Sequence, residues 1–140
     1  MMTDLPQGEN NLKAILANLS PSLSDDEYIF YSTKIMGKKE ILDLKPMATI
    51  QENEGITLVV LKETAELNFI PFNVIFKVIT LGIHSSLTGV GLTSVISNAL
   101  TKNGISSNVI AGYFHDHFFV KSEVAQKAME VLSKPLESSL

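Results

Sequence analysis

The sequence predicts an α+β fold of two small modules, each with a mostly antiparallel sheet covered by helices on one face. The 140 residues include 45% hydrophobic side chains, enough for a continuous core. Strand and helix patterns alternate in both halves of the chain, and a break separates the halves at residues 70–74. We therefore expect an N-terminal module at residues 10–70, a C-terminal module at 71–134, and flexible termini at 1–9 and 135–140.

The first elements are a short helix and a strand. Leucine and isoleucine side chains recur at helical spacing before Pro21, which predicts a helix at about residues 11–19. The aromatic and β-branched stretch Tyr28–Thr33 predicts a strand. Residues 37–45 are charged and begin with a glycine, and a proline follows them, so we expect a surface loop there.

A hairpin and a helix complete the predicted first module. Residues 47–51 and 56–61 have strand composition, and residues 52–55 contain the Asn and Gly that suit a chain reversal. Residues 62–69 contain helix formers and precede Pro71, which predicts one or two helical turns.

The second half opens with its clearest strand and helix. Residues 75–83 are almost continuously apolar, as expected of a central strand buried on both faces. A helix follows, because apolar residues recur on one face at i, i+3, i+4, i+7 and i+8: Leu92, Val95, Ile96, Ala99 and Leu100. Asn103-Gly104 stands where a left-handed cap is needed.

Two further strands and a helix end the second half. The strands are expected at residues 107–113 and 117–121, around a turn at 114–116. The helix is expected to start near Ser122, with Glu123 in its first turn. The order strand, helix, strand, strand, helix is that of a split βαβ unit.

Composition excludes several classes of function. The formal charge of −4 and the scattered 11 Lys and Arg residues argue against nucleic acid as a partner. The sequence contains no cysteine, which excludes disulfides and thiolate metal sites and fits a reducing cytoplasm. The first ten residues lack the pattern of a signal peptide, and no stretch has the roughly 20 apolar residues of a membrane helix. We expect a soluble cytoplasmic protein.

The stretch Gly91–Ile105 resembles the signature of ACT domains, in which a Gly opens the first helix and Asn-Gly-Ile leads into the next strand. Together with further matching segments, it resembles a family of small bacterial tandem ACT proteins of uncharacterised function, related in architecture to ACT-type amino-acid sensors. Those segments are Ala48-Thr49, Glu54–Val59, Ile79-Thr80, His84–Leu87, Val90–Thr93, Asn108–Tyr113 and His115–His117. The resemblance covers roughly residues 10–133 and implies two ferredoxin-like modules.

The resemblance also implies a ligand site. ACT domains that bind amino acids use the loop between the first strand and the first helix, with the start of a neighbouring strand. By position, the site residues here are His84, Ser85, Ser86, Leu87, Thr88, Gly89, Val90, Gly91, Ser107 and Asn108. The unpaired N–H groups at a helix start favour a carboxylate guest, and Gly89 and Gly91 allow close approach to the main chain.

The family's loops often carry an acidic residue that holds the ligand's ammonium group. The loop from His84 to Gly91 has none, so an acidic side chain from elsewhere would have to take this role, and Asp116 is the candidate.

Other chemistry has weaker support. Gly89-Val90-Gly91-Leu92-Thr93-Ser94 narrowly misses the dinucleotide fingerprint, because Ser94 replaces its last Gly. His84, His115 and His117 could form a three-nitrogen metal site, but a polar triplet between two strands is more often a turn. His84 could instead hydrogen-bond a ligand or a loop carbonyl.

Ser85 or Ser86 with His115 and Asp116 supplies the residue types of a hydrolase triad, without a nucleophile elbow. The carboxylates at 25–27 and 52–54 lie at predicted strand ends or turns, where exposure to solvent explains them without acid–base catalysis. The sequence thus predicts a non-catalytic protein, without cofactor or metal, that binds or senses a small molecule such as an amino acid or a related carboxylate and forms a homodimer. The alternative is a module that forms a homodimer through its sheet edges and binds no ligand.

Overall fold

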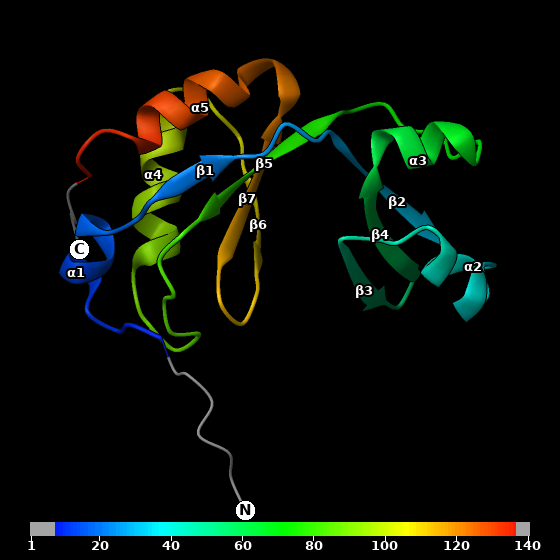
Figure 1. Cartoon of the computed structure of the whole chain (residues 1–140), viewed down its shortest axis with the longest axis horizontal. Helices are drawn as coiled ribbons and strands as arrows, with labels where there is room; N and C mark the ends of the chain where they lie inside the picture. Colours follow the sequence, from blue (N-terminus) through cyan, green and yellow to red (C-terminus); the bar gives the residue numbers. More distant parts are fainter. Residues whose placement is uncertain (1–7, 137–140) are drawn as a thin grey trace, which may run out of the picture. The chain divides into compact units, whose positions relative to one another are not determined.

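The order of helices and strands confirms the α+β prediction. The computed structural model describes residues 8–136, in which the backbone forms seven strands and five α-helices (Figure 1). The expected flexible termini lie outside the described residues, apart from residues 8, 9, 135 and 136. Contacts divide the chain into two compact units: unit 1 contains residues 8–24 and 78–136, and unit 2 contains Asp25–Lys77.

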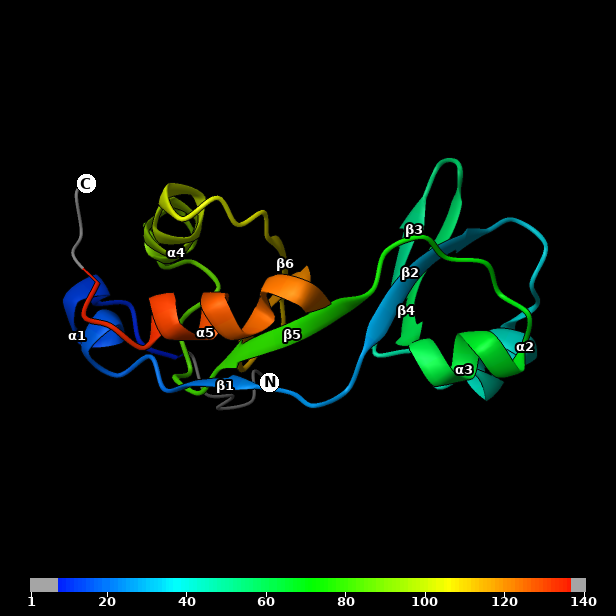
Figure 2. The same cartoon turned by 90° about the horizontal axis from the view of Figure 1, so that it is seen from above.

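Unit 2 is a small antiparallel sheet with two helices. Its strands lie in the order β3-β4-β2, and the first residue of β5, Phe76, pairs with Tyr28 of β2. Its elements in chain order are β2 (Tyr28–Thr33), α2 (Lys38–Asp43), β3 (Ala48–Glu52), β4 (Gly55–Leu61) and α3 (Lys62–Leu67). Both helices pack against one apolar cluster of the sheet, so they cover the same face, as Figure 2 shows. The strands expected at 28–33, 47–51 and 56–61 are confirmed.

The surface loop expected at residues 37–45 is wrong, because α2 occupies most of it. Ile41 and Leu44 are three residues apart and are 9% and 6% exposed, so this short stretch has a buried helical face. The charged side chains lie on the exposed face, where Lys39 and Asp43 form an ion pair of 2.9 Å. The helix was not predicted because the segment is mostly charged and only two apolar residues show the helical spacing.

Unit 1 has the strand order β1-β5-β7-β6. Its elements are α1 (Leu12–Ala17), β1 (Pro21–Leu23), β5 (Phe76–Leu81, of which residues 76 and 77 belong to unit 2), α4 (Leu92–Lys102), β6 (Asn108–Ala111), β7 (Asp116–Lys121), the 3₁₀ turn η1 (Ser122–Val124) and α5 (Ala125–Leu132). No sequence pattern predicts β1, which is three residues long and pairs antiparallel with the end of β5. Through β1 and α1, the N-terminal segment is part of the same compact unit as α4 and α5.

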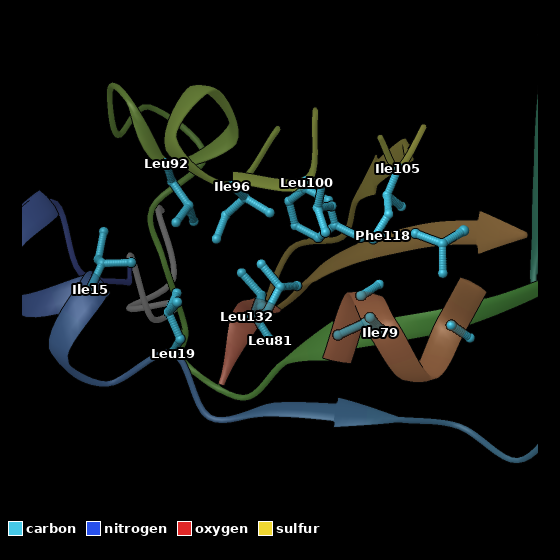
Figure 3. Packing of buried hydrophobic residues seen from close by; sticks show 13 residues of the cluster. Ile15, Leu19, Ile79, Leu81, Leu92, Ile96, Leu100, Ile105, Phe118 and Leu132 are labelled. Carbon is cyan, nitrogen blue, oxygen red and sulfur yellow. The ribbon is translucent and has the colours of Figure 1, made fainter. Parts of the chain in front are cut away.

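The core of unit 1 lies between its helices and its sheet. Figure 3 shows Leu92, Ile96 and Leu100 of α4 pointing toward side chains of β5 and β7, among them Leu81 and Phe118. This confirms the predicted apolar face of α4. The prediction that β5 is buried on both faces is also confirmed, because the successive residues Val78 and Ile79 are 3% and 0% exposed.

The predicted glycine cap of α4 is confirmed. Gly104 has φ 71°, its N–H donates to the carbonyl of Thr101 at 2.9 Å, and the N–H of Ile105 donates to that of Leu100 at 3.0 Å. These are the two hydrogen bonds of a Schellman motif. The cap fixes the end of α4 and turns the chain back toward β6.

The turn expected at residues 114–116 lies elsewhere. It spans residues 112–115 and is closed by the N–H of Gly112, which donates to the carbonyl of His115 at 2.8 Å. Asp116 is therefore the first residue of β7 and pairs with Ala111. Because side chains alternate along a strand, Asp116 lies on the same side of the sheet as the core residue Phe118.

Within residues 8–136, no helix combines the length and apolar character needed to cross a bilayer.

Candidate functional site

A cavity of about 250 Å³ lies at the start of α4, entirely within unit 1. Four parts of the chain line it: α1, the loop from β5 into α4, the first turn of α4, and the β6–β7 hairpin. The lining residues are Ile15, Ser85, Ser86, Leu87, Gly89, Val90, Gly91, Leu92, Thr93, Ser94, Ala111 and Asp116. Its volume is slightly below the range of about 300–1,000 Å³ typical of drug-sized ligands, so it suits a smaller molecule.

Most of the loop residues chosen from the sequence line this cavity, namely Ser85, Ser86, Leu87, Gly89, Val90 and Gly91. His84, Thr88, Ser107 and Asn108 do not line it. Asn108 is at the far end of β6, since the antiparallel hairpin places Ala111 opposite Asp116. The end of β6, rather than its start, thus contributes to the cavity.

The start of α4 supplies the positive side of the cavity. Gly91, the N-cap residue, has φ 101° and no side chain that could cap the helix. The first intrahelical bond runs from the N–H of Val95 to the carbonyl of Gly91 at 3.0 Å. The preceding N–H groups of Leu92, Thr93 and Ser94 have no acceptor within the helix and carry partial positive charge. An anionic group in the cavity could accept from them.

Asp116 supplies a negative group. Its Oδ2 accepts a hydrogen bond from Oγ of Ser85 at 2.9 Å, and Ser85 is only 9% exposed. Asp116 is the charged residue among those lining the cavity. The cavity therefore combines a carboxylate with a helix N-terminus of opposite polarity.

A tight turn shapes the loop between these groups. The N–H of Gly89 donates to the carbonyl of Ser86 at 3.1 Å, and the N–H of Thr88 donates to Oγ of Ser86 at 3.2 Å. A Cβ added at Gly89 would lie 3.2 Å from the Ser86 oxygen. The loop thus depends on the position of Ser86 and on a glycine at 89.

His84 belongs to an aromatic cluster beside the cavity. Its ring lies 4.9 Å from that of Phe114 and 6.0 Å from that of Tyr113. Its Nε2 is buried and has no hydrogen-bond partner among the described residues. The cluster packs the tip of the β6–β7 hairpin against the loop that follows β5.

His84 and His117 have different neighbours. Nδ1 of His117 lies 2.9 Å from Oγ1 of Thr80, while His84 packs against aromatic rings. Within the described part of the chain, no three His, Cys, Asp or Glu residues are grouped as a metal site requires.

Burial lowers the pKa of His117 below 6.5, the charge of His115 lowers it further, and Asp116 opposes the shift.

We expect His117 to make the stability of the protein depend on pH. Because its pKa is lowered by folding, the unfolded state takes up the proton first as pH falls, so stability is highest above about pH 6.5 and decreases as pH falls through the folded-state pKa. Melting temperatures of wild type and His117→Gln between about pH 8 and pH 5 test this. The variant should show the smaller decrease, and equal decreases would contradict the assignment.

The hydrolase and dinucleotide interpretations do not fit the geometry. The hydroxyl of Ser85 donates directly to Asp116, whereas a triad requires an imidazole between the two. A dinucleotide fold requires the strand after the helix to lie parallel to, and directly beside, the strand before the glycine-rich turn. Here β6 forms an antiparallel hairpin with β7, and β7 separates β6 from β5.

A second cavity, of about 280 Å³, occupies the equivalent position of unit 2, with Lys34, Glu52 and Glu54 in its wall. The adjacent helix α2 has only six residues, and the N–H of its N-cap residue, Gly37, donates to Oε1 of Glu40 at 3.4 Å. Neither Gly37 nor Glu40 lines this cavity, so it lacks the helix start that lines the cavity of unit 1.

The sequence matches the ACT domain twice, at residues 7–77 and at residues 73–134. The chain belongs to the ACT-domain family. The cavity at the start of α4 lies in its second ACT module, apart from Ile15. The module boundary expected near residue 70 stays a prediction. No protein with a curated description matches the sequence significantly.

Solved structures share this tandem ACT fold. The Vibrio cholerae protein VC0802, described as of unknown function and as a possible transport protein, is 43% identical, with a TM-score of 0.79 over 86% of this chain and 92% of that one. The regulatory subunit of aspartate kinase from Thermus thermophilus, in a ligand-free form, has 11% identity and a TM-score of 0.56 over 84% and 97% of the two chains. Aspartate kinase from Clostridium acetobutylicum has 11% identity and a TM-score of 0.63 over 84% of this chain and 34% of its own.

Five lining positions of the ACT cavity were not selected from the sequence: Ile15, Leu92, Thr93, Ser94 and Ala111. Thr93 and Ser94 follow directly from the first turn of α4 and could have been included with Gly91. Ile15 could not, because its helical spacing marks it as a core residue and it is 2% exposed. Its place in the wall depends on how α1 packs within unit 1.

Proposed function

We propose that this protein is a non-catalytic regulatory ACT protein that binds a small amino-acid-like carboxylate at the start of α4. The observation that carries the proposal is the cavity with Asp116 on one wall and the uncapped start of α4 on another. An α-amino acid carries a carboxylate and an ammonium group on one carbon. The carboxylate would accept from the N–H groups of α4, and the ammonium would donate to Asp116.

The lining residues favour a neutral side chain on the ligand. Leu87, Val90 and Ala111 contribute apolar surface, and the lining includes no Lys, Arg or His that could pair with an acidic side chain. A charged side chain would lose its hydration without compensation, and the cavity of about 250 Å³ leaves little room for a large one. Small neutral amino acids such as glycine, alanine, serine and valine are therefore the proposed class.

The family supports a regulatory role. The Thermus thermophilus relative is described as a regulatory subunit, and its likeness to this chain extends over nearly its whole length. In this proposal, the chain carries out no reaction. Its output is a change in conformation or association when the cavity is filled.

Thermal stability in the presence of amino acids tests the proposal. A ligand at 100 times its Kd adds about 2.7 kcal/mol to the stability of the state that binds it. Glycine, L-alanine, L-serine and L-valine, each at roughly 10 mM, should include at least one that raises the melting temperature. L-aspartate and L-lysine are the comparison, and unchanged melting across the whole panel would sink the proposal.

The second candidate is a module that associates through its sheet edges. β3 is an edge strand of unit 2 and β6 is an edge strand of unit 1, and four of the five residues of β3 are exposed, including Ile50 at 43%. An unpaired edge of this kind can pair with a second copy. Sedimentation at tens of micromolar tests this candidate, because a monomer there would eliminate it.

A further inference from the structure

The backbone of residues 8–10 runs beside the cavity loop. Glu9 forms a parallel bridge with Ser85, in which the N–H of Glu9 donates to the carbonyl of His84 at 2.7 Å. The N–H of Ser86 donates back to the carbonyl of Glu9 at 2.8 Å. The loop is therefore held from outside by two main-chain hydrogen bonds from the N-terminal segment.

This contact is close enough to require a glycine. Gly8 has φ 81°, and a Cβ there would lie 2.7 Å from the carbonyl carbon of Ser85. Gly89, on the other side of the loop turn, also approaches the segment, since a Cβ there would lie 3.7 Å from Oδ1 of Asn10. The segment and the loop thus pack main chain against main chain.

The same segment continues into a wall of the cavity. Oε1 of Glu9 accepts from the N–H of Asn10 at 3.0 Å and from that of Asn11 at 2.9 Å. Asn11 in turn caps α1 by accepting from the N–H of Ala14 at 3.1 Å. Ile15 of α1 lines the cavity.

We propose that residues 8–11 act as a strap that positions the cavity loop, so that docking of the strap and binding of the ligand are coupled. Both hydrogen bonds that form the loop turn, from Thr88 and from Gly89, end on Ser86. The strap holds Ser86 through its N–H, so release of the strap releases the turn. Coupling is reciprocal, and a bound ligand therefore favours the docked strap. This coupling rests on the proposed function, whereas the positioning of the loop does not.

Amide hydrogen exchange of the full chain, measured by NMR without ligand, tests the positioning. Gly8→Ala introduces the clash with Ser85, and Glu9→Pro removes the N–H that donates to His84. Each should lower the protection of the Ser86 and Gly89 amides by about tenfold or more. The matched control is Gly104→Ala, because Gly104 also has positive φ but its Cβ would meet nothing within 4 Å. This control should leave both amides unchanged.

The outcomes separate the strap from the proposed function. If the Ser86 and Gly89 amides keep wild-type protection from exchange in both strap variants, the positioning role is overturned. It is also overturned if the Ser86 amide loses protection while the Gly89 amide keeps it. In a second arm, the panel amino acid that most stabilises wild type should bind Gly8→Ala about tenfold more weakly, and equal affinity overturns the coupling. If no panel member stabilises wild type, the proposed function and the coupling fail together, while the exchange data still decide the positioning role.

Discussion

Replacing Phe118 by alanine is expected to lower the free energy of unfolding by about 3–5 kcal/mol, the usual range for a buried phenylalanine. Phe118 is 0% exposed and belongs to the cluster that joins β5, β7, α4 and α5 (Figure 3). Domains of this kind have a total stability of about 5–15 kcal/mol, so the loss is a large part of it. Equilibrium urea unfolding is the measurement.

Two further variants show whether this loss comes from burial. Phe118→Leu fills more of the space and should cost less than Phe118→Ala. Phe114→Ala makes the same chemical change at a side chain that is 49% exposed in the same unit, and should cost about 1 kcal/mol or less. A similar loss for Phe118→Ala and Phe114→Ala would contradict the core described here.

Asp116→Asn should weaken ligand binding by about 10–100-fold, because hydrogen bonds to a charged group are worth about 1.5–3 kcal/mol. Asparagine keeps the shape and can still accept from Ser85, so the change removes the charge that would pair with the ligand's ammonium. Calorimetric titration with the amino acid that stabilises wild type most is the measurement. Stability without ligand should change little.

The matched control for this variant is Glu123→Gln. It removes the same charge from an exposed residue of η1, which follows the opposite end of β7 from Asp116. Its affinity should equal that of wild type. If Asp116→Asn also bound with wild-type affinity, Asp116 would have no part in holding the ammonium group.

Long periodic elements were predictable from the sequence, and short ones were not. The apolar stripe of α4 spans three turns, so its buried face was predicted correctly. Its end was also predicted correctly, because Asn103-Gly104 has the residues that a Schellman cap requires. In α2, by contrast, only Ile41 and Leu44 mark the buried face. β1 is three residues long and forms because β5 offers an edge, a cause that no local pattern contains.

The candidate site was predictable to the extent that it is local. The loop from Ser85 to Gly91 precedes a helix and contains the glycines that a close approach needs, so it could be found from sequence. Asp116 was a candidate only because the loop lacks an acid, and the structure places it in the cavity wall. The contributions of Ile15 and of the strap depend on tertiary packing of the N-terminal segment, which leaves no signal in the residues themselves.

The account depends on an anionic group of the ligand lying at the start of α4. The most direct test is an NMR titration with glycine, L-alanine, L-serine and L-valine that follows the backbone amides of the whole chain. We predict that at least one of them shifts the amides of Leu92, Thr93 and Ser94 most. The account would be contradicted if the chemical shifts of these three amides did not change at a saturating concentration of an amino acid that stabilises the protein. It would also be contradicted if they changed no more than the shifts of the α5 amides.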